Sequence, residues 1–138
     1  WIDVAREYTE RLIHQQHIRD AAARPLLTER WAVSPLFDTF LLALPNALRA
    51  VQAPTGANVH LTIRGEAGCT WIVRKSATGW AFGSDRGVEP FAALTLEQDD
   101  AWRLFTKRLT PDQVCPRAAL RGDETALEAM LEMVTVLA

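Results

Sequence analysis

The side chains best suited to chemistry are an acid and an imidazole near the start of the chain. Glu10 and His14 are four residues apart in the stretch 1–24, which contains no proline or glycine. In an α-helix this spacing places both side chains on one face, so a carboxylate oxygen and a ring nitrogen can bind one cation, and a zinc-type site then needs a third protein ligand. The same spacing fits an exposed ion pair worth about 0.3 kcal/mol. His17, one turn further on, fits either a hydrogen bond to a ligand or a solvated side chain.

A second group of polar side chains alternates with apolar ones in the stretch 58–74. This period of two is typical of half-buried strands, so one face of a sheet would carry basic and hydroxyl-bearing side chains. Such a face fits an anion, but it is more often the side of a half-buried antiparallel sheet that is open to water. The group consists of His60, Thr62, Arg64, Thr70 and Arg74.

The elements that would position these groups begin with helices. The pattern predicts one long helix over 1–24, ended by Pro25, because proline disfavours helix in the residue before it. Its apolar side would carry Trp1, Val4, Ala5, Tyr8 and Leu12. A connector over 26–34 and then two short helices, or one kinked helix, over 35–51 are expected to follow, with Pro45 opening the second.

The rest of the chain predicts a sheet with further helices. Two turns, over 65–68 and 76–79, divide the stretch 58–82 into a three-stranded antiparallel meander. We then expect a strand over 91–96, a helix over 99–109 capped by Asp99 or Asp100, a strand over 117–121, and a helix over 124–137 capped by Asp123. The predicted fold class is therefore α+β, an antiparallel sheet of about five strands flanked by helices and preceded by one long helix.

The composition limits the class of protein and its partners. The chain has 138 residues, of which 49% are hydrophobic and 23% charged, which is typical of one soluble globular domain. A net charge of −2 gives no reason to expect a nucleic-acid partner, and no apolar run approaches the ~20 residues that span a bilayer, so no membrane partner is expected. Cys69 and Cys115 do not form a CxxC motif, and two scattered thiols suit a cytoplasmic location.

Most of the chain resembles a known family. The stretch from Tyr8 to Ala21 resembles the last bundle helix of the DinB-like, mycothiol-dependent maleylpyruvate isomerase family. The remainder resembles that family's C-terminal domain, which is similar to sterol carrier protein 2. The resemblance implies two domains, the last helix of a metal-binding bundle over 1–25 and a sterol carrier protein 2-like domain over 26–138. Its second part is carried by Val59–Ile63, Thr70–Val73, Gly79–Trp80 and Leu120–Asp123.

The resemblance also implies site residues and cofactors. Glu10 and His14 would bind a divalent metal, expected to be zinc, and mycothiol would supply the thiol. The family carries the remaining ligand, a histidine, on an earlier helix. Because the first residue is Trp1, we expect the chain to be a piece of a longer protein, with an incomplete metal site. Where the family often has Gly-Arg before its last strand, this chain has Lys107-Arg108, so Arg108 is the candidate for binding a substrate carboxylate, although an arginine that ends a helix also fits the helix dipole.

Three hypotheses about function follow. The first is the C-terminal portion of a metal-dependent and mycothiol-dependent isomerase or thiol transferase, similar to maleylpyruvate isomerase and acting on a small molecule. The alternative is a non-catalytic, sterol carrier-like module that binds a lipid or another small molecule. The third is an interaction domain that forms a homodimer or packs against the missing bundle helices, because Trp1, Tyr8 and Leu12 would be exposed without a partner.

Overall fold

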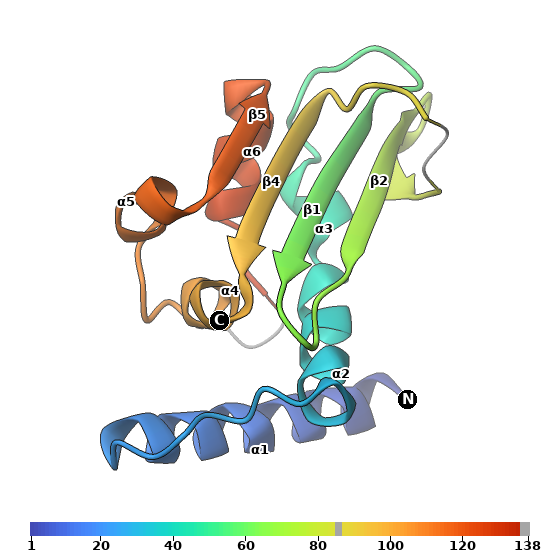
Figure 1. Ribbon diagram of the computed structural model, residues 1–138. Helices are drawn as coiled ribbons and strands as arrows, with labels where there is room; N and C mark the ends of the chain where they lie inside the picture. Colours follow the sequence, from blue (N-terminus) through green and yellow to red (C-terminus); the bar gives the residue numbers. More distant parts are fainter. Residues whose placement is uncertain (85–86, 136–138) are drawn as a thin grey trace.

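The computed structural model describes residues 1–84 and 87–135, and it has an α+β architecture built on one five-stranded sheet (Figure 1). The spatial order of the strands is β3-β2-β1-β4-β5. This confirms the predicted fold class and the expected number of strands. The strands are β1 (Asn58–Arg64), β2 (Thr70–Ser76), β3 (Gly79–Phe82), β4 (Ala92–Glu97) and β5 (Ala119–Gly122).

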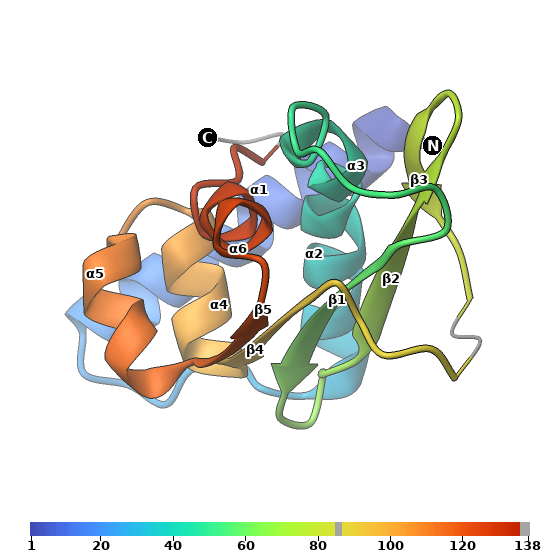
Figure 2. The ribbon, with the colours of Figure 1, turned by 90° about the horizontal axis from the view of Figure 1, so that it is seen from above.

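Helices cover one face of this sheet and one of its ends. Figure 2 shows α2, α3, α4 and α6 on the same side of the strands, and Figure 1 shows α1 lying across the end at which β1 and β4 finish. None of the helices in the described ranges is long and apolar enough to cross a bilayer. The helices are α1 (Ile2–Ala21), α2 (Arg30–Leu41), α3 (Leu44–Ala47), α4 (Gln98–Phe105), α5 (Pro111–Val114) and α6 (Glu124–Leu131), with a 3-10 turn η1 (Cys115–Arg117).

The sheet is mixed, whereas the sequence predicted an antiparallel one. The meander is confirmed, since β1 pairs antiparallel with β2, and β2 with β3. The fourth strand, however, pairs with β1 in parallel, with Val59 opposite Ala92 and Leu61 opposite Leu94. The reason is topological. β2 and β3 occupy one side of β1, so the chain after β3 crosses back, and β4 starts at the same end of the sheet as β1 (Figure 1).

Several helix boundaries differ from those predicted, and α1 itself ends at Ala21 rather than at residue 24. α2 begins at Arg30, so part of the expected connector is helical, and Pro35 lies inside the helix. α4 ends at Phe105 rather than near residue 109, and its N-cap is Glu97 rather than Asp99 or Asp100. α6 ends at Leu131, while the rest of the expected helix either is not helical or lies at 136–137, outside the described residues. Asp123 caps α6 as predicted, because its carboxylate accepts a hydrogen bond from the Ala126 N–H.

The face of α1 that packs on the rest of the protein also differs from the predicted apolar side. Trp1, Val4 and Tyr8 are exposed, and the buried residues are Thr9, Leu12, Ile13 and Gln16. Leu12, which was expected to share an exposed stripe, is therefore in the core. The buried face of α1 thus combines two apolar core residues, Leu12 and Ile13, with the polar residues Thr9 and Gln16. A homodimer or packing against further helices stays a prediction, as does the division at residue 25.

The core lies between the sheet and the helices. Alternate residues of β1 and β4 point into it, among them Leu61 and Leu94, and Phe37, Phe40 and Phe105 of the helices are fully buried against them. This layer holds the end of β4, and so the start of α4, in place.

Two leucines that face each other across β4 and β5 test the position of this core. Leu94 is fully buried, whereas its partner Leu120 on the edge strand is 38% exposed. We expect Leu94→Ala to lower the free energy of unfolding by about 3 kcal/mol, because it leaves a cavity, and Leu120→Ala to lower it by less than about 1 kcal/mol. Urea unfolding followed by circular dichroism measures both. Equal losses for the two variants would contradict the packing described.

Candidate functional site

Glu10 and His14 lie on α1 as the helical spacing predicts. Both side chains are exposed, and they line one hollow of about 210 Å³ together with His17 and with Thr106, which follows α4. We call this region the α1–α4 junction. The structure therefore brings the predicted pair to a shared surface.

His17 is the least exposed of the three polar α1 residues in this hollow. Its ring centroid is 5.7 Å from that of Trp102 in α4 and 6.3 Å from that of His14. Burial lowers the pKa of His17, and the positive charge of Arg108 lowers it further. His17 thus packs on the Trp102 indole in surroundings that disfavour the protonated form of its ring. Its partial burial departs from the solvated side chain that the sequence allowed. Its contact with Trp102 is also not the hydrogen bond to a ligand that was the other alternative.

The residues present do not complete a metal centre. Glu10 and His14 supply two donors, and a zinc site needs at least a third from the protein. Within residues 1–84 and 87–135, no three His, Cys, Asp or Glu side chains gather closely enough to hold a metal ion.

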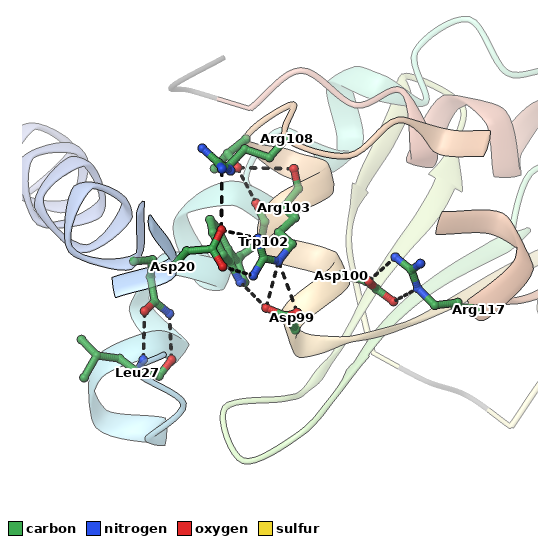
Figure 3. A network of polar contacts seen from close by, with 10 residues as sticks. Asp20, Leu27, Asp99, Asp100, Trp102, Arg103, Arg108 and Arg117 are labelled. Atoms are coloured by element: carbon green, nitrogen blue, oxygen red, sulfur yellow. Dashed lines mark hydrogen bonds and ion pairs between the residues drawn. The ribbon is translucent and has the colours of Figure 1, made fainter. Parts of the chain in front are cut away.

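Arg108 lies beside this junction and has a partner. Its guanidinium is 3.6 Å from the Asp20 carboxylate of α1. Asp20 is held more closely by Arg103 of α4, which donates two hydrogen bonds to it, at 2.8 and 2.9 Å (Figure 3). Because Arg108 is the second guanidinium on one carboxylate and is 45% exposed, it keeps donor capacity for a ligand.

The residue before Arg108 adopts a backbone conformation that is typical of glycine. Lys107 has a φ of 61°, the left-handed conformation that glycine adopts most readily at a helix end. Its ammonium group donates hydrogen bonds to the carbonyls of Glu132 and Met133, just after α6. These bonds to otherwise free carbonyls offset the backbone strain, which is of order 1 kcal/mol.

The polar face predicted on β1 and β2 exists but is not one site. Thr62 lies opposite Thr70, and their hydroxyl groups are 2.9 Å apart on the sheet face that the helices leave uncovered. Arg64 ends β1, whereas Arg74 pairs with Asn58 at its start. Six residues of strand separate these two positions by about 20 Å, so a small anion cannot contact both arginines.

Sequence reasoning missed a pocket at the end of the sheet. A hollow of about 350 Å³ lies among α1, the α1–α2 connection, the β1–β2 turn and the start of α4. We call it the loop pocket. Leu26, Leu27 and Trp102 give it an apolar lining, and the charged side chains that line it are Arg64, Glu66, Glu97 and Asp99.

Two glutamines fix the walls of the loop pocket. Gln16 of α1 donates to the Leu27 carbonyl and accepts from the Leu27 N–H, at 2.8 and 2.9 Å. Gln98 of α4 accepts from the Ala67 N–H and donates to the Thr28 carbonyl. Both glutamines are buried, and each amide donates one hydrogen bond and accepts another, so these bonds hold the walls together. The one indication of this role in the sequence is that Gln16 lies four residues after the apolar Leu12, on the same face of the predicted helix.

Comparisons with known proteins give structural likenesses only. No protein-family model matches the chain, and no curated protein matches it. Sterol carrier protein 2 like 2 from Aedes aegypti is 20% identical over 71% of this chain and 95% of its own, with a TM-score of 0.48. Sterol carrier protein domain 2 of Helicoverpa armigera is 13% identical over 70% of this chain and 82% of its own, with a TM-score of 0.49. Sterol carrier protein 2 from Yarrowia lipolytica is 14% identical over 72% of this chain and 89% of its own, with a TM-score of 0.46.

The ion pair between Asp20 and Arg103 predicts how α1 responds to acid. The hydrogen bonds from Arg103 lower the pKa of Asp20 in the folded protein. Its contribution to stability is therefore complete above the ordinary aspartate pKa of about 3.9 and is lost as the pH falls through the lower, folded value. We expect the wild type to lose more free energy of unfolding than Asp20→Asn between pH 6 and pH 2.5, as measured by urea unfolding.

The matched control is Asp112→Asn, on an exposed carboxylate of α5 that makes no ion pair with any residue in the described ranges. This variant should keep the acid sensitivity of the wild type. If Asp20→Asn were as acid-sensitive as Asp112→Asn, the Asp20 ion pair would not hold α1 in solution.

Proposed function

We propose that this chain is a binding module for a small amphipathic molecule, held in the loop pocket. The observation that carries the proposal is an apolar hollow whose walls are fixed in advance by Gln16 and Gln98. Ligand sites are typically preformed hollows of about 300 to 1,000 Å³ with apolar linings and a few placed polar groups. A preformed site also spares the ligand the cost of ordering loops.

The volume limits the size of the ligand. A water molecule takes about 30 Å³ in the liquid, so a hollow of about 350 Å³ holds a ligand of about a dozen non-hydrogen atoms. At the ligand efficiencies usual for molecules of this size, such a ligand would bind with a Kd on the order of 0.1 to 1 mM. Octan-1-ol is a suitable uncharged probe.

A cytoplasmic location, suggested by the two free cysteines, belongs to the same proposal.

Filling the loop pocket tests this function. We expect octan-1-ol to shift the backbone amide NMR signals of Thr28, Gly65 and Gln98 and the indole signal of Trp102, because these residues line the hollow. In Leu26→Trp the larger side chain occupies part of that space, so the affinity should fall at least about tenfold, at a cost in stability of about 1 kcal/mol.

Leu42→Trp is the control, since Leu42 lies at the end of α2, is 38% exposed and does not line the pocket. It should bind octan-1-ol like the wild type. Absence of shifts at these four residues in the wild type at saturating octan-1-ol would overturn the proposal.

A second candidate function is the metal-dependent and mycothiol-dependent isomerase or thiol transferase. The observation in its favour is that Glu10 and His14 share a hollow with His17, whose pKa is lowered in part by the charge of the nearby Arg108. A cation site and a guanidinium for a carboxylate substrate would then lie at one junction. The proposal assigns Glu10 and His14 as metal ligands and Arg108 as the substrate-binding residue.

Zinc titration tests the assignment of the two ligands. We expect Zn²⁺ to shift the imidazole NMR signals of His14, and Glu10→Ala or His14→Ala to weaken binding by at least about tenfold, because each removes one of two donors. Glu7→Ala is the control, since Glu7 is exposed on the same helix and lies 3.9 Å from Arg11. Equal zinc affinity in all four proteins would remove Glu10 and His14 as ligands.

A further inference from the structure

The charged side chains that line the loop pocket are mostly acidic. Glu66 in the β1–β2 turn, Glu97 at the end of β4 and Asp99 in α4 are carboxylates, and Arg64 at the end of β1 is the one guanidinium among the lining residues. Arg103 pairs with Asp99 and lies 4.6 Å from the Trp102 ring, so a ligand in this hollow would lie near three negative and two positive charges. The net charge of these side chains is negative, as it is for the whole chain, but here the charges line one hollow.

The ion pairs within this group leave one carboxylate uncompensated. Arg64 lies 3.9 Å from Glu97, and both side chains are more than half exposed. Asp99 accepts hydrogen bonds from the Arg103 side chain, at 3.1 and 3.2 Å. Glu66 has neither an ion pair nor a side-chain hydrogen bond with any residue of the ranges 1–84 and 87–135. Its charge is thus available to a ligand.

Besides Arg64, the beginning of α4 would favour an anion, because a helix N-terminus carries a partial positive charge. Two carboxylates, Asp99 and Asp100, already lie in its first turn. In addition, the carboxylate of Asp99 accepts a hydrogen bond from the Trp102 indole, which keeps it at this helix end. An anionic ligand would gain little from the helix and would meet Glu66 and Glu97.

We infer that the loop pocket selects an organic cation, a compact apolar molecule with one protonated amine. The inference rests on the proposed binding function and specifies its ligand. The apolar body would contact Leu26, Leu27 and Trp102, and the ammonium group would lie at the mouth beside Glu66. Arg64 does not reverse this preference for a cation, because its positive charge is paired with the carboxylate of Glu97.

Three probes that differ only in the head group test this inference. Octylammonium, octan-1-ol and octanoate share the same apolar chain, and at pH 7 they carry a positive, no and a negative charge. One favourable charge contact in a solvent-exposed mouth is worth about a fivefold change in affinity. We expect octylammonium to bind about fivefold more tightly than octan-1-ol, and octanoate more weakly than either, in NMR titrations of the wild type at low salt.

A matched pair of variants locates the charge that is responsible. Glu66→Gln keeps the shape of the side chain, and the preference for octylammonium over octan-1-ol should fall at least about twofold. Glu128→Gln, on the exposed side of α6, should leave the preference unchanged. Because the octan-1-ol affinity serves as the internal reference, a general loss of folding or binding cannot imitate this result. Added salt at about 0.5 M should also narrow the preference, since it screens exposed charges.

The outcomes separate this inference from the function on which it rests. If octan-1-ol binds but octylammonium binds no more tightly, or if octanoate binds best, the cation preference is overturned and the binding module stands. If Glu66→Gln leaves the preference unchanged, the assignment to Glu66 is overturned. If none of the three probes shifts the signals of the pocket residues, both proposals fail.

Discussion

Both candidate sites depend on the side chain of Arg103. Its guanidinium binds Asp20 of α1 with two nitrogens and Asp99 of its own helix with the third, and it lies 4.6 Å from the centre of the Trp102 ring (Figure 3). A planar guanidinium with donors on all three nitrogens suits this arrangement, which the single ammonium of a lysine could not reproduce. Only 18% of the Arg103 side chain is exposed, so water competes weakly for these bonds. By fixing α1 against α4, the contact sets one wall of the loop pocket and the spacing of His17 and Trp102 at the α1–α4 junction.

The parts of the fold that the sequence predicts well are those determined by neighbouring residues. The two short turns of the meander and the Asp123 cap are local signals, and the structure confirms them. The parallel pairing of β1 with β4 is different, because β4 could pair with either edge strand of the meander, β1 or β3. No single residue of β4 determines which edge it joins. The rotation of α1 was predicted wrongly because apolar periodicity was its only guide. In the protein, the buried face of α1 also carries the Gln16 amide, which binds Leu27, and Asp20 binds Arg103, whereas Trp1 is exposed.

The same distinction applies to the candidate sites. The Glu10 and His14 pair could be found from its spacing, because one helix carries both residues. Arg108 could be placed only at a helix end, since its partner Asp20 is more than eighty residues earlier in the chain. The loop pocket could not be predicted from the sequence because four separate segments enclose it. The bridging role of Gln16 and Gln98 depends on hydrogen bonds between those segments, which form only in the folded protein. Long-range polar contacts of this kind follow from the fold and cannot be inferred ahead of it.

The parallel contact at the centre of the sheet has a consequence for how the chain folds. β1 and β2 are joined by a short turn and can pair within microseconds, as hairpins do. Pairing Val59 with Ala92 instead closes a long loop that includes the whole hairpin, and the entropy of that closure must be met before β4 gains any contacts. We therefore expect the meander to form first and β4 to join it in the slow step, carrying α4 with it. On that order of events the hollow at the end of the sheet is among the last features to form, and it would be the first to open when the protein begins to unfold.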